Sequence, residues 1–116
     1  MEKITIKERR QAIKESIKHH LRMARWVRTQ PPDDPPNCID MRTAIKESWG
    51  AGDCNLCKLY NLIYRDKCIK CPLYKRYGQC NRKSVKNAYY KLHKSFTWKE
   101  WLKHNLELRR QLRSLL

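Results

Sequence analysis

The chain is poor in acidic residues and has no long apolar run. Only 11 of its 116 residues are Asp or Glu, against 27 Lys and Arg, so the formal net charge is +16. A net charge of magnitude about 2–8 is enough to keep a small domain soluble. No apolar stretch approaches the roughly 20 residues that span a bilayer, and the N-terminus lacks a secretory signal. We therefore expect a cytoplasmic protein with no membrane partner.

Familiar catalytic patterns are missing as well. The sequence has no glycine-rich phosphate loop, no serine-nucleophile motif and no constellation of paired carboxylates. A cysteine nucleophile requires a positioned histidine, which spacing does not establish. None of the histidines falls at ligand spacing from the cysteines; they are His19, His20, His93 and His104. We expect that the protein is not an enzyme.

What the chain does have is a cluster of cysteines. Five of its six cysteines lie within 27 residues, as two Cys-x-x-Cys pairs separated by ten residues and a trailing cysteine. Zinc takes four donors, at about 2.3 Å when they are sulfur, and each Cys-x-x-Cys turn supplies two. In a reducing compartment such clusters bind metal more often than they form disulfides. The spacing predicts a zinc site made by Cys54, Cys57, Cys68 and Cys71.

The trailing cysteine, Cys80, has three open roles. It replaces one of the four zinc ligands, remains a free thiol, or helps to hold an iron–sulfur cluster. Cys71-Pro72 is similar to the last ligand of bacterial ferredoxins, but the tight run of Cys-x-x-Cys steps is missing. An iron–sulfur cluster is therefore the less favoured cofactor. The sixth cysteine, Cys38, is expected to be a small buried residue.

Apolar periodicity predicts helices and no strands. Residues 5–30 form a helix that opens with the capping-box spacing of Thr5 and Glu8, and most of its remaining surface is basic. Four prolines in residues 31–37 end this helix and make a stiff spacer. The predicted organisation is a basic N-terminal helix over 1–30, a linker over 31–37 and a helical metal-binding domain over 38–116. The fold class is small and all-α, with an irregular zinc-pinned cysteine loop.

Capping residues predict the helices of the third region. Asn37 opens a short helix that stops at residues 50–52, and Asp53 opens one that carries the first cysteine pair. Ser84 opens another helix, and Thr97 with Glu100 forms a second capping box. The buried face of that last helix consists of Trp98, Trp101, Leu102, Leu108, Leu112 and Leu115.

Three short motifs surround the cysteines: Asp53-Cys54-x-x-Cys57-x-x-Tyr60, Cys68-x-x-Cys71-Pro72-Leu73 and Gly78-x-Cys80. Together they resemble a pattern found in small, largely uncharacterised bacteriophage proteins. The likeness covers roughly residues 50 to 82, so the basic N-terminal helix and the Trp-rich C-terminal helix are not part of it. The resemblance implies a phage-encoded accessory protein that acts in the host cytoplasm, and it implies no particular activity.

Basic residues and tyrosines are interleaved through and beyond the cysteine cluster. Between Cys54 and Lys94 there are eleven Lys and Arg residues and one acid, Asp66. Lys and Arg make charge-assisted contacts with phosphates, and exposed tyrosines stack on unpaired bases. Since no recognition-helix motif is present, we expect DNA or RNA to be bound through its backbone. The predicted contact residues are Arg9, Arg10, Lys14, Lys70, Lys75, Arg76, Tyr77, Arg82, Lys83 and Lys86.

The same features also suit a different class of function. A phage-encoded inhibitor or adaptor would dock on an acidic host protein, such as a defence nuclease or the transcription machinery. Interface energy concentrates in Trp, Tyr and Arg, so the four tryptophans are potential anchors, although they serve equally as core residues. These are Trp26, Trp49, Trp98 and Trp101. A third interpretation is an iron–sulfur redox or sensing module.

Overall fold

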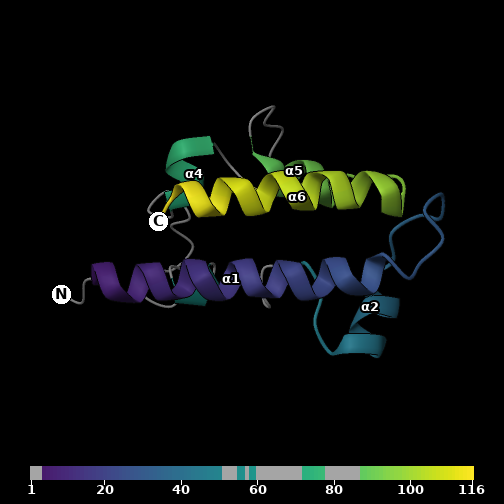
Figure 1. Ribbon diagram of the computed structural model, residues 1–116, viewed down its shortest axis with the longest axis horizontal. Coiled ribbons are helices and arrows are strands. Elements are labelled where there is room, and N and C mark those ends of the chain that lie inside the picture. Colours follow the sequence, from purple (N-terminus) through teal and green to yellow (C-terminus); the bar gives the residue numbers. More distant parts are fainter. Residues whose placement is uncertain (1–3, 51–54, 57, 60–71, 78–86) are drawn as a thin grey trace.

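The computed structural model describes residues 4–50, 55–56, 58–59, 72–77 and 87–116 (Figure 1). In these ranges the regular structure is entirely helical, which confirms the predicted all-α class. Residues 55–56 and 58–59 are helical as well. The named helices are α1 (Ile6–Val27), α2 (Cys38–Ile45), α4 (Pro72–Tyr77), α5 (Ala88–His93) and α6 (Trp98–Ser114).

Helix α1 begins at the predicted capping box. The Glu8 N–H donates to Thr5 Oγ1 at 3.0 Å, and the Thr5 N–H donates to Glu8 Oε1 at 3.2 Å. These two bonds satisfy donors that the first turn of a helix leaves without partners. The helix ends at Val27, three residues before the predicted end, with Arg28 as its C-cap.

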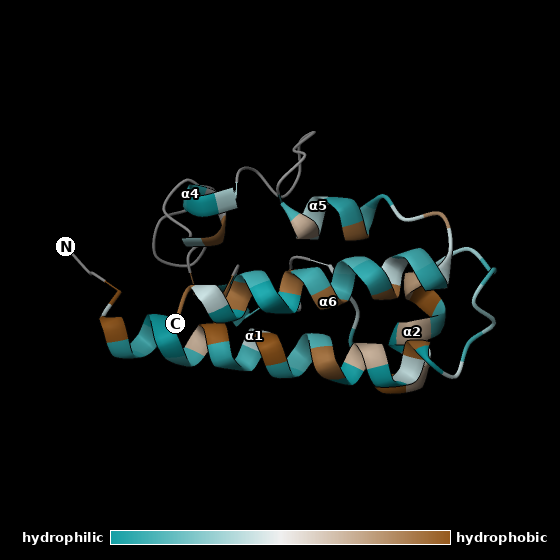
Figure 2. Cartoon of the chain, turned by 45° about the horizontal axis from the view of Figure 1, so that its top comes forward, coloured by the Kyte–Doolittle hydropathy of each residue, from teal (hydrophilic) through white to brown (hydrophobic). Residues whose placement is uncertain are grey.

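Helices α1 and α6 lie side by side and run in opposite directions (Figure 1). Near the end of α1, the Trp26 ring packs edge-on against Trp98, the first residue of α6, with a centroid distance of 5.5 Å. Further along, Asn105 Nδ2 donates to the carbonyl oxygen of His20 at 3.0 Å. Hydrophobic positions recur along both helices between hydrophilic ones, as Figure 2 shows. The predicted N-terminal helix thus shares one core with the C-terminal helix.

Tryptophans fill one end of this core. Trp49, Trp98 and Trp101 are buried, and their rings meet edge to face with centroids 5.6 to 5.9 Å apart. The Tyr89 hydroxyl donates to the Trp49 carbonyl oxygen, which fixes the segment after α2 against α5. Aromatic pairs of this kind contribute about 0.5–1.5 kcal/mol each beyond their buried area.

The proline-rich segment is bonded to the start of α6. The Trp98 N–H donates to the Asp34 carbonyl oxygen at 2.9 Å, and the Lys99 N–H donates to that of Pro32 at 2.9 Å. Prolines keep their carbonyl acceptors although they lack N–H donors. The segment therefore caps the first turn of α6 with backbone oxygens.

Two local predictions are wrong. Cys38 is exposed, because α2 contributes only Met41 to the core and its first turn lies at the surface. The helix predicted from Ser84 begins instead at Ala88, since Asn87 is its N-cap and accepts from the Tyr89 N–H at 2.9 Å. Ser84 itself lies outside the described residues.

Helix α2 is capped by Asn37 as predicted, but it ends early. The Asn37 side chain accepts from the Ile39 N–H at 2.9 Å. The helix stops at Ile45 because Lys46 adopts a left-handed conformation with φ of 64°. Across the described ranges, no helix combines the length and the apolar character needed to cross a membrane.

Candidate phosphate-binding surface

The predicted metal ligands lie outside the described residues. This applies to Cys54, Cys57, Cys68, Cys71 and Cys80, and also to the predicted phosphate contacts Lys70, Arg82, Lys83 and Lys86. Within the described ranges, no group of three or more His, Cys, Asp or Glu side chains is placed to hold a metal ion. Zinc binding stays a prediction from the spacing of the cysteines.

Two of the three predicted contacts on α1, Arg10 and Lys14, share one face of the helix. Arg10 and Lys14 are exposed, and Lys7 lies one turn before them, whereas Arg9 is partly buried. Residues three or four apart lie on the same side of a helix. Together with Ile6 and Gln11, the three exposed cations line a depression on the surface of α1. They form no ion pair with any residue that the structure describes.

The acids of α1 are engaged with other partners. Glu8 is part of the capping box. Glu15 accepts from Gln11 Nε2 at 2.9 Å and lies 3.6 Å from Lys18 Nζ. Lys7, Arg10 and Lys14 therefore keep their positive charge available to a ligand.

Two predicted phosphate contacts on α4 bind instead to the end of α6. Arg76 Nη1 donates to the Ser114 carbonyl oxygen at 3.2 Å, and the Tyr77 hydroxyl lies 2.8 Å from Ser114 Oγ. A cation beside the last carbonyls of a helix is also favoured by the helix dipole. These bonds attach α4 to α6 and leave the exposed Lys75 and the outer part of Arg76 facing solvent.

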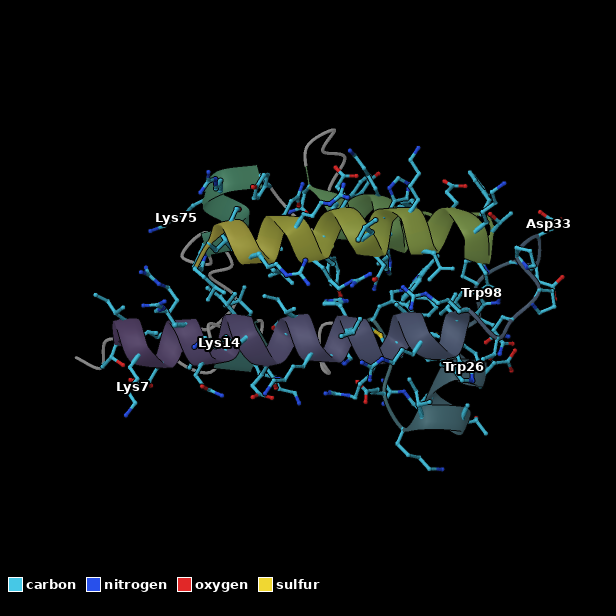
Figure 3. The ribbon with its side chains drawn as sticks, in the orientation of Figure 1. Lys7, Lys14, Trp26, Asp33, Lys75 and Trp98 are labelled. Carbon is cyan, nitrogen blue, oxygen red and sulfur yellow. The ribbon has the colours of Figure 1, made fainter. Side chains whose placement is uncertain are left out.

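Cations from three helices gather at one end of the molecule. Because α1 and α6 are antiparallel, the last turn of α6 lies beside the first half of α1, and α4 is bonded to that turn. Figure 3 shows Lys7, Lys14 and Lys75 at this end, while Trp26, Trp98 and Asp33 lie at the other. We call this end of the molecule the basic end; its exposed cations are Lys7, Arg10, Lys14, Lys75, Arg76, Arg110 and Arg113.

A buried histidine that the sequence did not reveal, His19, ties α1 to the segment after α2. His19 is only 2% exposed, and its Nδ1 is hydrogen-bonded to Glu47 Oε1. Arg22 Nε donates to Glu47 Oε2 at 2.9 Å. Burial raises the pKa of Glu47, but the hydrogen bonds from Arg22 and His19 outweigh it, so the pKa lies below its ordinary value. These contacts span 25 to 28 residues, so local spacing contains no signal for them.

One residue between the two cysteines of the first pair, Leu56, is anchored on α1 near this histidine. Leu56, which stands between Cys54 and Cys57 in the sequence, is buried and donates its N–H to Ser16 Oγ at 3.2 Å. Ser16 precedes His19 by one turn of α1. Leu56 is therefore held by a serine inside a helix, and the pattern of apolar residues does not predict that contact.

The tryptophans differ in their availability to a partner. Trp49, Trp98 and Trp101 are 8%, 3% and 0% exposed, so their side chains belong to the core. Trp26 is only partly buried and packs against the edge of this core. Of the four potential anchors, only Trp26 offers surface without rearrangement of the fold. No protein-family model, curated protein or solved structure matches this chain.

Proposed function

We propose that this chain is a small zinc-binding accessory protein, encoded by a phage, that binds DNA or RNA in the host cytoplasm without catalysis. The observation that supports it best is the basic end, where Lys and Arg side chains from α1, α4 and α6 are exposed at the same end of the molecule. Such a concentration of positive charge attracts polyanions. The phosphate backbone of a nucleic acid is the polyanion we propose.

Binding through this surface is electrostatic and independent of sequence. Cations that neutralise phosphates release the counterions condensed on the nucleic acid, which makes the affinity depend steeply on salt. Lys and Arg on exposed helix faces position a backbone, whereas sequence is read by side chains that reach base edges. The protein therefore binds unrelated oligonucleotides with similar affinity.

Zinc holds the cysteine segment in this proposal. Four thiolates are the donor set of a structural zinc site, and Cys54, Cys57, Cys68 and Cys71 supply them at suitable spacing. Lys70 follows the third of these cysteines closely, and Arg82 and Lys83 follow Cys80. A metal-held segment thus adds these predicted phosphate contacts to the cations of the basic end. The resemblance to phage proteins supports the phage origin.

Fluorescence anisotropy with labelled duplex DNA and single-stranded RNA, across a range of salt concentrations, tests the nucleic-acid proposal. If about six phosphates are neutralised, the logarithm of the affinity for duplex DNA falls with that of the salt concentration at a slope near −5. Absence of binding at low salt would overturn the proposal. Metal analysis of the same sample should give one zinc per chain; a brown protein with visible absorbance would indicate an iron–sulfur cluster instead.

A pull-down from nuclease-treated bacterial lysate separates this function from inhibition of a host protein. If the protein binds nucleic acid, nuclease treatment of the lysate should remove the molecules that the protein otherwise captures. A stoichiometric host protein that survives the treatment would favour the inhibitor or adaptor, with Trp26 as the accessible tryptophan.

A further inference from the structure

Arg109 of α6 is an arginine held inside the helix pair. It is only 7% exposed. Its Nε donates to Asn105 Oδ1 at 2.9 Å, and Asn105 Nδ2 in turn donates to the His20 carbonyl oxygen of α1 at 3.0 Å. The guanidinium is therefore oriented by a chain of bonds that begins on the backbone of the neighbouring helix.

The charge of this arginine has no counter-charge among the described residues. An arginine side chain stays protonated in proteins. No carboxylate in the described ranges forms an ion pair with Arg109, and its remaining N–H groups donate to no other described residue. The Nη atoms are not among the buried polar atoms that lack a partner, so they reach the surface, where an anion can approach them.

The charged groups that act on Arg109 are cations. Burial lowers the pKa of Arg109, and Arg113, Arg28 and Arg110 lower it further. Arg113 lies one turn further along α6, and Arg28 is the C-cap of α1. These cations add positive potential at a guanidinium that forms no ion pair with a described carboxylate.

We propose that Arg109, together with Arg113 one turn further along α6, binds a phosphate-type oxyanion. Because Asn105 occupies only Nε, the Nη groups remain as a planar pair of donors, which suits bidentate contact with phosphate oxygens. The oxyanion is either free phosphate or one phosphate of a bound nucleic acid; the second case rests on the function proposed above. In either case the anion supplies the missing counter-charge.

Isothermal titration of the zinc-loaded full chain with inorganic phosphate, at constant ionic strength, tests the site without nucleic acid. The wild type should bind one phosphate, and Arg109→Gln should weaken binding roughly tenfold or more, as expected for loss of charge-assisted hydrogen bonds. Arg113→Glu places a carboxylate four residues from Arg109 at an exposed position and should abolish phosphate binding while the chain stays folded. Lys103→Glu makes the same charge change at another exposed position of α6 and should leave binding intact.

The outcomes separate this site from the proposed function. Phosphate binding that is lost in Arg113→Glu and kept in Lys103→Glu supports the site, whether or not the chain binds an oligonucleotide. Competition between inorganic phosphate and a bound oligonucleotide assigns the anion to the nucleic-acid backbone. The absence of phosphate binding to the wild type, or an equal loss in both glutamate variants, overturns the site even if the oligonucleotide binds.

Discussion

The two ends of the α1–α6 pair differ in what their side chains do. At one end, Trp49, Trp98 and Trp101 are buried against each other, and the proline segment is bonded to the first turn of α6. At the basic end, Ile6 is 68% exposed and cations from three helices face solvent. One end is therefore built mainly from packed aromatic rings, and the other exposes cations from three helices beyond a core that continues through Ile13 and Leu112. Changes at the two ends should therefore separate folding from binding.

The largest effect on stability is expected from Trp101→Ala. Trp101 is fully buried and contacts two other tryptophans, so its truncation removes apolar burial and leaves a cavity. We expect a loss of about 3–5 kcal/mol in the free energy of unfolding, measured by urea denaturation with zinc present. Trp26→Ala, at the edge of the same cluster, should cost less. A loss below about 1 kcal/mol for Trp101→Ala would contradict a core centred on this cluster.

The next effect concerns Glu47, between the two ends. Its pKa is lower in the folded chain than the ordinary value of 4.5, so ionised Glu47 adds stability above that value. This part of the stability is lost as the pH falls below 4.5 and through the lower folded pKa. Glu47→Gln should cost about 1–3 kcal/mol at neutral pH and make the unfolding free energy less sensitive to acid. An unchanged acid dependence would contradict the role given to this carboxylate.

A smaller effect compares the two helix caps. Thr97 caps α6 at the tryptophan end, where its hydroxyl accepts from the Glu100 N–H at 3.2 Å, and Thr5 caps α1 at the basic end. Thr97→Ala should lower the unfolding free energy by about 1 kcal/mol. Thr5→Ala should cost less, because a helix terminus with few buried contacts opens locally before the whole chain unfolds. Equal costs would show that the basic end is as firmly packed as the other.

Local sequence signals predict most of the fold. The spacing of Thr5 and Glu8 and of Thr97 and Glu100 predicts where α1 and α6 begin, and in α1 both bonds of the box form. In α6, by contrast, the Glu100 carboxylate accepts from the Phe96 N–H rather than from its cap. The sequence predicts that α5 begins after Ser84, whereas the helix begins after Asn87. Serine and asparagine are both good N-caps, so packing decides between the two positions.

The site is less accessible to sequence reasoning, because its key contacts are distant along the chain. The run Lys75-Arg76-Tyr77 reads as a set of phosphate contacts, but two of its members bond to Ser114, 37 to 38 residues away. No local sequence signal points to Arg109, because its burial depends on how α6 packs against α1. Net charge and helix faces indicate a polyanion partner, and only the antiparallel pairing brings the cations together.

The salt dependence of binding to duplex DNA, compared between two matched triple variants, tests the central claim most directly. The first variant combines Lys7→Gln, Arg10→Gln and Lys14→Gln at the basic end. The second combines Lys94→Gln, Lys99→Gln and Lys103→Gln, which are equally exposed but lie elsewhere. The basic-end variant should bind more weakly, with a salt slope smaller in magnitude by about 3 units, while the second keeps the wild-type slope. Equal losses in both variants, or no loss in the first, would contradict the account.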